Sequence, residues 1–368
     1  GMKKNIIPEA YVAFSLVALA IVLSPTIISI WDTQASSLYL PIPSTLNGQF
    51  IRYINITSNS QMNLILNVTV PYNNTNYQKS SLLIDSKNRY YYNNGYNRTW
   101  ITFVINSSTN IKLIYNFDVK SISYPVSEYN SLNISYIPES LKKQYLGDEY
   151  LFGEKVIMPE MFKNITKNIV KNDTNVFQME KSIYDYIVKN FKYKVTYTKE
   201  NLPNSAWKTY LLGVGDCVEL SFLYVSMSRA IGIPAWVEFG WLYTMSTWAE
   251  HAWVGTLIPT NKGIVYGIID LTEEVGSSDL GIGFFIRDPY RLTEWVDDGN
   301  STHLTNYYTL LYGKAENYQF NEKIIPKNES FGQYALLPVP ADAINPFIYR
   351  FSLVIGVSAL IYFIIRKK

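Results

Sequence analysis

Apolar residues recur at every second position in two stretches of the first half of the chain. In residues 62–70 every second residue is apolar, and residues 111–119 repeat the pattern. Because successive side chains of a strand point to opposite faces, both stretches are predicted to be half-buried strands. Asn93 to Gly95 lies between two tyrosine-rich runs and predicts a hairpin turn. Short strands separated by turn residues favour an antiparallel β-sandwich over residues 38–137.

A helical period replaces the alternation from about Pro159 onward. Apolar residues recur at steps of three and four over residues 176–191 and again over 218–231, where Gly232 and Pro234 end the run. Predicted strands follow at about 234–242, 250–258 and 263–270. Helices followed by antiparallel strands indicate an α+β domain, which we place at residues 150–320.

Two long apolar runs flank these domains, at residues 6–31 and 346–365. Each is long enough to cross a hydrocarbon core of about 30 Å. Lys3 and Lys4 precede the first run and basic residues close the chain, so the positive-inside rule places both termini in the cytoplasm and the middle of the chain outside. The first run also fits a signal peptide, and the sequence leaves anchor and signal peptide open. Residues 321–345, rich in proline near their end, are predicted to be a juxtamembrane linker.

The region between the apolar runs is rich in N-x-[ST] sequons, which are acceptors for glycosylation on an extracytoplasmic surface. The candidate asparagines are Asn55, Asn67, Asn73, Asn97, Asn106, Asn133, Asn164, Asn172, Asn300 and Asn328. Together with the expected topology, they predict a glycoprotein of an archaeal or eukaryotic cell membrane, with the bulk of the chain at the cell surface.

Composition narrows the classes of chemistry. Charged residues make up 17% of the chain and the net charge is +2, without a basic patch, so nucleic acid is not an expected partner. A single cysteine excludes an intrachain disulfide and cysteine-based zinc sites. With 2 histidines a multi-histidine metal site is not expected either, and neither a metal nor an organic cofactor is implied. The sequence does not predict the oligomeric state.

The single cysteine, Cys217, lies where a helix is predicted to begin, and His251 and Asp270 lie on two of the strands that follow. A thiol attacks a carbonyl as thiolate, which a helix N-terminus and an imidazolium both favour. Asp216 is placed to cap this helix. We expect His251 to act as base and then acid, and Asp270 to hold the Nδ1–H group of its ring.

Two tryptophans are predicted to lie around this site. Trp253 shares a strand face with His251, so it is expected to form a wall of the site. The Cys217 backbone N–H is one expected oxyanion donor. Trp207, whose indole N–H is a donor, is a candidate for the second.

Four segments together resemble the transglutaminase-like superfamily. They are Gly215-Asp216-Cys217-Val218-Glu219, Ser228 to Ala235, Glu250-His251-Ala252-Trp253-Val254 and Ile269-Asp270-Leu271-Thr272. The resemblance covers about residues 175–275. It implies a papain-like α+β core in which Cys217, His251 and Asp270 form a catalytic triad. Leu271 departs from the pattern, in which proline often follows the aspartate.

The sequence therefore predicts a transglutaminase-like (papain-like) core preceded by a β-sandwich and flanked by transmembrane helices. The expected activity is that of a membrane-anchored extracytoplasmic cysteine enzyme that attacks peptide or isopeptide amides of a protein or peptide substrate through a Cys217 thioester. The resemblance favours hydrolysis over cross-linking. A non-catalytic surface protein that uses the same fold for binding or as a scaffold is the alternative.

Overall fold

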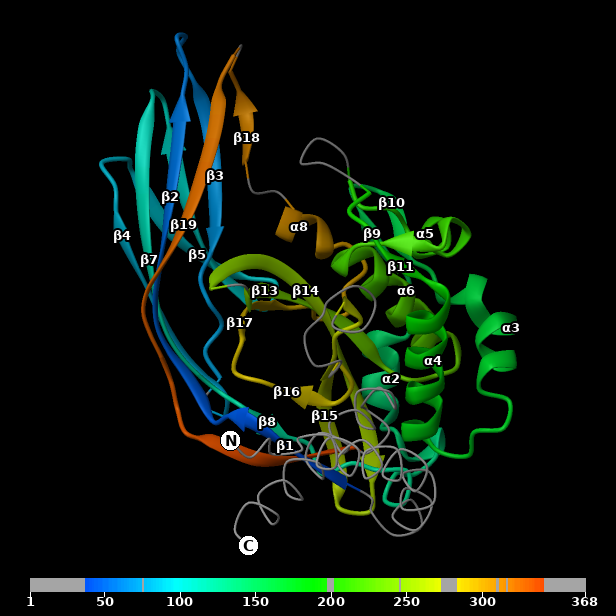
Figure 1. The fold of residues 1–368 in the computed structure, drawn as a ribbon. Coiled ribbons are helices and arrows are strands. Elements are labelled where there is room, and N and C mark those ends of the chain that lie inside the picture. The colour runs from blue at the N-terminus through cyan, green and yellow to red at the C-terminus, as the bar shows by residue number, and fades with distance from the viewer. Residues whose placement is uncertain are drawn as a thin grey trace, which may run out of the picture.

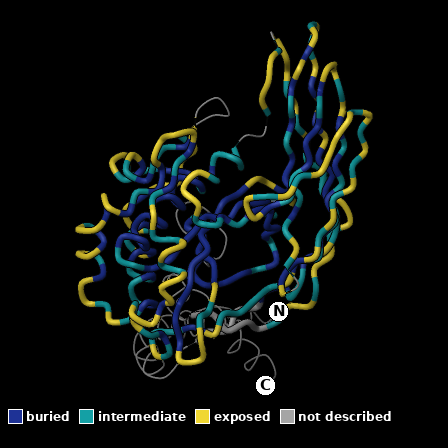
Figure 2. Tube along the Cα trace, turned by 180° about the vertical axis from the view of Figure 1, so that it is seen from behind, coloured by how far each residue is buried: buried dark blue, intermediate teal, exposed yellow. Residues whose placement is uncertain are grey.

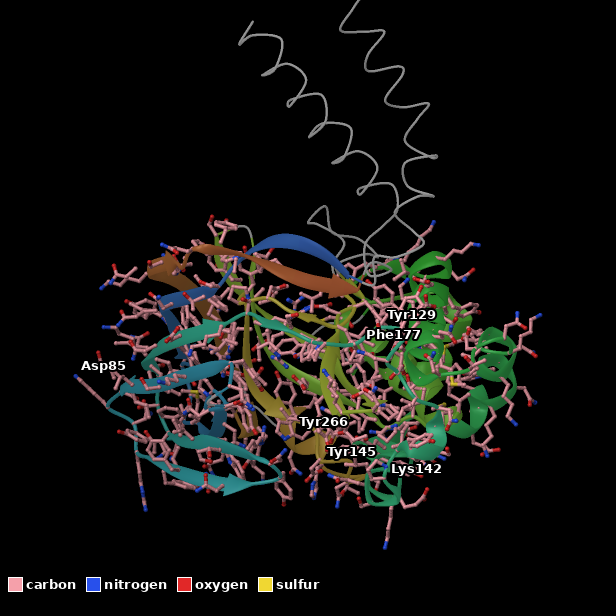
Figure 3. The ribbon with its side chains drawn as sticks, turned by 90° about the horizontal axis from the view of Figure 1, so that it is seen from below. Asp85, Tyr129, Lys142, Tyr145, Phe177 and Tyr266 are labelled. Atoms are coloured by element: carbon pink, nitrogen blue, oxygen red, sulfur yellow. The ribbon has the colours of Figure 1, made fainter. Side chains whose placement is uncertain are left out.

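The computed structural model describes residues 37–340, except 75, 197–201, 245, 273–282, 309–310 and 316. The two apolar runs, at residues 6–31 and 346–365, lie outside these residues. Within the described part of the chain, no helix has both the length and the apolar character that crossing a membrane requires. Two units stand side by side (Figure 1): a sandwich of strands, and a mixed unit in which α3 (Pro159–Ile169), α4 (Val176–Asn190) and α5 (Ala206–Leu212) lie on the side away from the sandwich. Asp85 projects from the sandwich on the opposite side of the molecule from Lys142 of the mixed unit (Figure 3).

The sandwich consists of two antiparallel four-stranded sheets. One sheet has the order β18-β3-β6-β5, formed by Leu311–Lys314, Asn63–Thr69, Arg98–Ile105 and Tyr90–Gly95. The other has the order β19-β2-β7-β4, formed by Gln319–Phe331, Thr45–Thr57, Thr109–Lys120 and Gln78–Asp85. The alternation predicted in residues 62–70 and 111–119 is confirmed, because the apolar residues of both stretches line the core of the sandwich.

The predicted hairpin forms, but its turn lies further along the chain than expected. Strands β5 and β6 pair antiparallel up to Gly95 opposite Arg98, so Tyr96 and Asn97 form the turn. Both have positive φ, at 53° and 59°, which is the backbone of the two-residue turn that matches strand twist. The register places Tyr90 opposite Phe103, a core residue. Burial of that residue, rather than the Asn-Gly pair, sets the position of the turn.

The C-terminal boundary of the sandwich corrects the sequence-based domain limits. After the second unit the chain forms β18 and β19, which add one strand to each sheet of the sandwich. The α+β domain therefore ends before residue 320. The prediction of a linker over residues 321–345 is wrong for residues 321–331, which belong to β19. β19 includes Pro326, and because β19 is the edge of its sheet, a residue without an N–H is tolerated there. Further along, β20 (Tyr334–Pro340) pairs with β1 (Ser37–Pro43), and Ser37 lies opposite Pro340.

The second unit, residues 122–308, is called the α+β unit below. Its main sheet has the order β15-β14-β13-β17, formed by Gly263–Ile269, Thr247–Thr260, Ala235–Thr244 and Arg291–Val296. The predicted strands at 234–242, 250–258 and 263–270 are thus confirmed, and β13 and β14 are each longer at the hairpin that joins them. Tyr145, Trp236 and Tyr266 form an aromatic ladder at this sheet (Figure 3), with ring centroids 4.8 and 6.3 Å apart.

Helices cover the sheet, and the helical periods predicted from Pro159 onward are confirmed. The helices are α2 (Glu139–Tyr145), α3 (Pro159–Ile169), α4 (Val176–Asn190), α5 (Ala206–Leu212), α6 (Cys217–Ala230) and α8 (Leu304–Tyr308), with a 3-10 turn at Ile134–Tyr136. Short strand pairs lie beside them: β9 (Glu149–Leu151) with β10 (Glu154–Ile157), β11 (Lys192–Tyr193) with β12 (Val214–Gly215), and β8 (Ile122–Ser123) with β16 (Ile286–Arg287). Every residue of α6 after Cys217 is buried, so this helix is the centre of the unit.

The two units share a packed boundary rather than a flexible linker. Trp241 of β13 and Trp248 of β14 belong to the core of the sandwich, where their rings lie 5.2 and 5.3 Å from that of Phe50. Buried segments run continuously from one unit to the other (Figure 2). Because β14 also carries His251 and Trp253, the sandwich helps to fix the strand on which part of the predicted site lies.

Candidate active site

Cys217 is the first residue of α6, and the start of this helix is fixed by a capping box. The Asp216 carboxylate accepts hydrogen bonds from the N–H groups of Val218 and Glu219, at 3.0 and 3.1 Å. The Glu219 side chain in turn accepts from the backbone N–H of Asp216 at 3.2 Å. This confirms Asp216 as the cap and leaves the Cys217 N–H outside the cap's hydrogen bonds. The cysteine itself is half-buried and makes no disulfide.

Gly215 allows the chain to approach α6 closely. A Cβ atom at this position would lie 2.9 Å from Thr209 Cγ2 and 3.0 Å from Glu219 Cβ, closer than such contacts permit. The Gly215 carbonyl accepts a hydrogen bond from the Lys194 N–H at 2.9 Å, within the parallel pair of β11 and β12. Close packing therefore explains the glycine in the Gly-x-Cys pattern. The pairing of β11 with β12 brings the segment around Tyr193 next to the cysteine.

Glu219, which lies in the same motif segment as Cys217, has a structural role. Its side chain is fully buried. Besides capping α6, it accepts hydrogen bonds from the Thr196 hydroxyl and from the Asn204 N–H, at 2.5 and 2.8 Å. Glu219 thus ties the chain on both sides of residues 197–201 to the start of the catalytic helix.

His251 lies on β14 with its ring buried and directed at Asp270. The ring Nε2 atom is 2.8 Å from Asp270 Oδ2 and 3.3 Å from the Thr272 hydroxyl. The expectation that Asp270 would hold Nδ1 is therefore wrong. Strand register explains the difference: Val254 pairs with Ile269, so Asp270 follows at the level of Trp253, and the carboxylate meets the far end of the His251 ring. The Nδ1 atom is left to face Cys217.

The Asp270 carboxylate is held from several directions. Its Oδ1 atom accepts from the Thr272 N–H at 3.1 Å and from the Thr272 hydroxyl at 2.7 Å. Its Oδ2 atom accepts from Nε and Nη2 of Arg291, at 3.2 and 2.8 Å, in addition to its contact with His251. Thr272 was visible in the motif, whereas Arg291 was not, because no spacing rule connects it to the triad. Asp270 is thereby fixed in position and kept ionised.

The electrostatics favour a charged imidazole ring. Burial alone would lower the pKa of His251, but the Asp270 carboxylate and Cys217, which also bond to the ring, outweigh it and raise the pKa to about 10. Burial would raise the pKa of Asp270, yet His251 and Arg291 hold that pKa well below its ordinary value. A doubly protonated ring donates through Nε2 to Asp270 and through Nδ1 to the sulfur. The arrangement therefore suits a thiolate–imidazolium pair.

Tyr193 is a residue near the sulfur that the sequence did not single out. It lies on β11, opposite Gly215 of β12. Burial raises the pKa of Tyr193 above its ordinary value, and the nearby Cys217, Asp216 and Asp270 raise it further, so its hydroxyl stays protonated and able to donate. The residue is 41% exposed, which places it at the opening of the site.

The two tryptophans named from the sequence take different positions. Trp253 lies beside His251, with ring centroids 6.0 Å apart, and its Nε1 donates to Glu238 Oε2 at 2.7 Å. It is fully buried, so it backs the histidine from inside the protein. Trp207 lies on α5 and packs against Phe162 and Tyr210, with ring centroids 5.7 and 5.4 Å away. Its role as an oxyanion donor stays a prediction.

Other polar residues near the motifs serve the fold. Glu250, next to His251, lies on the other face of β14, 3.6 Å from the guanidinium of Arg52 in the sandwich. His303 pairs with Asp298 at 2.9 Å and packs on the ring of Tyr96. Across the described ranges no group of three or more His, Cys, Asp or Glu side chains is arranged to hold a metal ion. Of the sequon asparagines, Asn67 is half-buried, and the others are exposed at the surface.

Comparison with known proteins agrees with this geometry. Residues 163–266 match the family model of the transglutaminase-like superfamily. The match contains Cys217 and His251 and ends before Asp270. This part of the chain is a transglutaminase-like domain. No curated protein matches the chain.

Among solved structures, a candidate cysteine protease from Cytophaga hutchinsonii is similar to this chain with a TM-score of 0.54 at 16% identity, over 82% of this chain and 98% of that one. The periplasmic domain of TgpA from Pseudomonas aeruginosa gives a TM-score of 0.34 at 11% identity, over 66% of this chain and 94% of that one. The latter score is too low to carry an argument. The Cytophaga structure shows that the fold is shared over 82% of this chain.

Proposed function

We propose that this protein is a membrane-anchored, extracytoplasmic cysteine enzyme that cleaves peptide or isopeptide amides through a thioester on Cys217. One observation carries the proposal: the His251 ring joins Asp270 at 2.8 Å through Nε2 and interacts with Cys217, a half-buried residue at the start of a buried helix. A scaffold protein has no use for an ionised carboxylate that positions an imidazole ring beside a thiol.

The chemistry proceeds in two steps. The Cys217 thiolate attacks the carbonyl carbon, and the His251 imidazolium gives its proton to the leaving amine as the thioester forms. Water, deprotonated by the now neutral ring, then attacks the thioester and releases the acid and the thiol. An amine in place of water would give a new amide instead. Hydrolysis is the outcome we propose, on the basis of the resemblance to cysteine-protease-like structures.

The developing oxyanion needs two donors. The Cys217 N–H, which the Asp216 cap leaves aside, is one. The Tyr193 hydroxyl is our candidate for the second, because the pairing of β11 with β12 places Tyr193 opposite Gly215, two residues before Cys217, whereas Trp207 packs on Phe162 and Tyr210.

The proposed location rests on the apolar runs at 6–31 and 346–365. Pairing of β1 with β20 supports it, because Ser37 lies opposite Pro340 and the chain therefore enters and leaves the described fold at one place. Two spans attached there would enter the same stretch of membrane side by side. Exposed sequon asparagines on both units are also compatible with glycosylation of the outer surface.

Activity is tested on the purified full chain with a mixture of quenched fluorescent peptides, with and without a fluorescent primary amine. Peptide cleavage that Cys217→Ala abolishes supports the hydrolase. Incorporation of the amine into protein, without cleavage, would contradict hydrolysis and establish a cross-linking enzyme. Equal signals from the wild type and Cys217→Ala in both assays would contradict the catalytic proposal and support the non-catalytic scaffold. Location is tested by mass spectrometry of the natural protein, where glycans at the sequons are the expected result.

A further inference from the structure

Arg291 is a buried cation that the triad chemistry described above does not require. It begins β17, the strand next to β13, and its register partner is Leu242. Its side chain is 1% exposed, and it contributes two donors to Asp270 Oδ2, the same oxygen that receives the His251 ring. Since both nitrogens lie 2.8 Å from one oxygen, the guanidinium and the imidazole are within about 6 Å of each other.

A second carboxylate fixes the other end of the guanidinium. Arg291 Nη1 pairs with Asp288 Oδ2. Asp288 is itself held by the turn before β17, because its Oδ1 accepts from the Tyr290 N–H at 3.0 Å. The arginine is thus clamped between two carboxylates, one of which belongs to the triad. A planar guanidinium can hold both, whereas a lysine ammonium has no equivalent geometry.

We propose that Arg291 is a positioning residue of the Cys217–His251–Asp270 triad, which fixes the Asp270 oxygen that holds the imidazole and offsets the negative charge that the ring and the sulfur meet. This inference rests on the proposed function, since it matters only if Cys217 and His251 react as a pair. Arg291, which lies outside the recognised motif, then controls both the position of the His251 ring and the pH range of the reaction.

The charge argument has a definite sign. Loss of a proton from the thiol, or later from the imidazolium, makes the site more negative by one unit. A nearby positive charge favours each loss, so Arg291 moves both to lower pH. Removing the charge of Arg291 must therefore move the whole profile to higher pH, whereas removing the charge of Asp288 must move it to lower pH.

Other charged or titratable groups face the pair from the surrounding elements. They are Asp216 at the start of α6, Tyr193 on β11, Glu238 on β13, and Tyr124 beside β8, which also feels the charge of Arg291. Glu238 is neutralised by Arg287 of β16 at 3.0 Å. This makes Arg287 a matched control: it is buried and paired with a carboxylate like Arg291, but its partner does not touch the His251 ring.

The test needs no knowledge of the substrate. The rate of Cys217 alkylation in the full chain is measured from pH 3 to 11 with neutral iodoacetamide and with anionic iodoacetate. The rising limb of the profile reports formation of the thiolate. The falling limb with iodoacetate reports loss of the imidazolium, which attracts the anionic reagent. Thermal unfolding of each variant is measured in parallel.

Arg291→Met is expected to move both limbs to higher pH by about 1 pH unit, and Asp288→Asn to move them in the opposite direction. Arg291→Lys keeps the charge, so its limbs stay near those of the wild type while the maximal rate falls several-fold, because the carboxylate is less well fixed. Arg287→Met should lower the unfolding temperature without moving the limbs.

Unchanged limbs in Arg291→Met, with a loss of stability like that of Arg287→Met, would show a purely structural arginine and overturn the inference. If Arg291→Met does not fold, Arg291→Lys and Asp288→Asn decide: a wild-type rate in the first and unmoved limbs in the second contradict the proposal. A wild-type profile equal to that of a free thiol peptide would instead refute the proposed function itself, so the two failures are distinguishable.

Discussion

In the sandwich, the side chains that fill the interior are almost all apolar, and they recur at every second position of the strands. Three of its buried polar residues, Arg52, Gln78 and Arg98, bond or pair with residues of the α+β unit at the boundary. The α+β unit, by contrast, buries charges in its centre. These include Glu149, Glu180, Glu219, Arg229, Asp270, Arg291 and Asp297.

The contrast shows what each unit is built to do. Alternating apolar residues stabilise a sandwich with little need for exact partners, so many sequences would serve. A buried charge is stable only with well-placed partners, and Glu180 illustrates this: it accepts from the hydroxyls of Tyr224, Ser228 and Thr256, on two different elements. Such networks hold α4, α6 and β14 in one arrangement. The triad requires that rigidity, because its three residues come from separate elements.

The largest expected effect separates chemistry from stability. Cys217→Ser should lower amide cleavage by roughly 10⁴-fold or more, since the alcohol has no comparable anion at neutral pH. Because the side chain is half-buried and little changed in size, the unfolding temperature should stay nearly the same. Leu113→Ala, in the core of the sandwich, is the matched opposite: about 2–5 kcal/mol less stable, with unchanged turnover per folded molecule. Peptide cleavage measures the activity of each variant, and urea unfolding measures its stability. A loss of stability in Cys217→Ser similar to that of Leu113→Ala would contradict the expected separation.

A buried ion pair provides the stability counterpart within the α+β unit. Arg229 lies 2.5 Å from Glu149 and 3.8 Å from Asp297, and all three side chains are inaccessible. Arg229→Met leaves two carboxylates without a cation, which should lower the free energy of unfolding by about 3–5 kcal/mol. The double variant Arg229→Met with Asp297→Asn should recover part of that loss. Urea unfolding checks this, and an unchanged midpoint in the single variant would mean that the charge network does not hold the unit together.

The next largest expected effect on activity comes from removing an oxyanion donor. Tyr193→Phe removes the hydroxyl beside Cys217 and should lower kcat by about 10²-fold with little change in KM. Trp207→Phe, which keeps the packing on Phe162 and Tyr210, should change kcat less than about threefold. Steady-state cleavage rates distinguish them. A reversed order of the two effects would restore Trp207 as the donor that the sequence suggested.

The last expected effect, similar in free energy to that of Tyr193→Phe, is on the pH dependence of stability. Burial raises the pKa of Glu180 to about 7, against the donated hydrogen bonds that lower it. A carboxyl whose pKa is raised on folding contributes stability that is complete below its unfolded value and is lost as the pH rises through its folded value. Stability should therefore decline between about pH 4.5 and 7, and Glu180→Gln should flatten that decline by up to ~3 kcal/mol. Equal slopes for both proteins in urea unfolding would contradict this.

The sequence predicted the parts whose signal is local. Alternation placed residues 62–70 and 111–119 in the sandwich, and the helix start at Cys217 was predicted from Asp216 and the apolar run behind it. What was missed depends on contacts between distant segments. Pairing of β19 with β2 made a predicted linker part of the sandwich, and strand register decided which nitrogen of His251 meets Asp270.

Arg291 and Tyr193 were missed for the same reason. Arg291 reaches Asp270 although β17 and β15 are the two edge strands of one sheet, and Tyr193 reaches Cys217 because β11 pairs with β12. Neither residue has a fixed spacing from the motif. The sequence of a single chain does not show which distant residue a given tyrosine or arginine will contact.

The central claim is that Cys217 reacts as one member of an ion pair with His251. The most direct measurement is the rate of iodoacetamide alkylation at pH 6 in the full chain, compared with the His251→Ala variant and with a model thiol peptide. At this pH a free thiol is almost entirely protonated. We predict that the wild-type protein reacts at least about 10-fold faster than the peptide and that His251→Ala reacts like the peptide. Equal rates for all three would contradict the account.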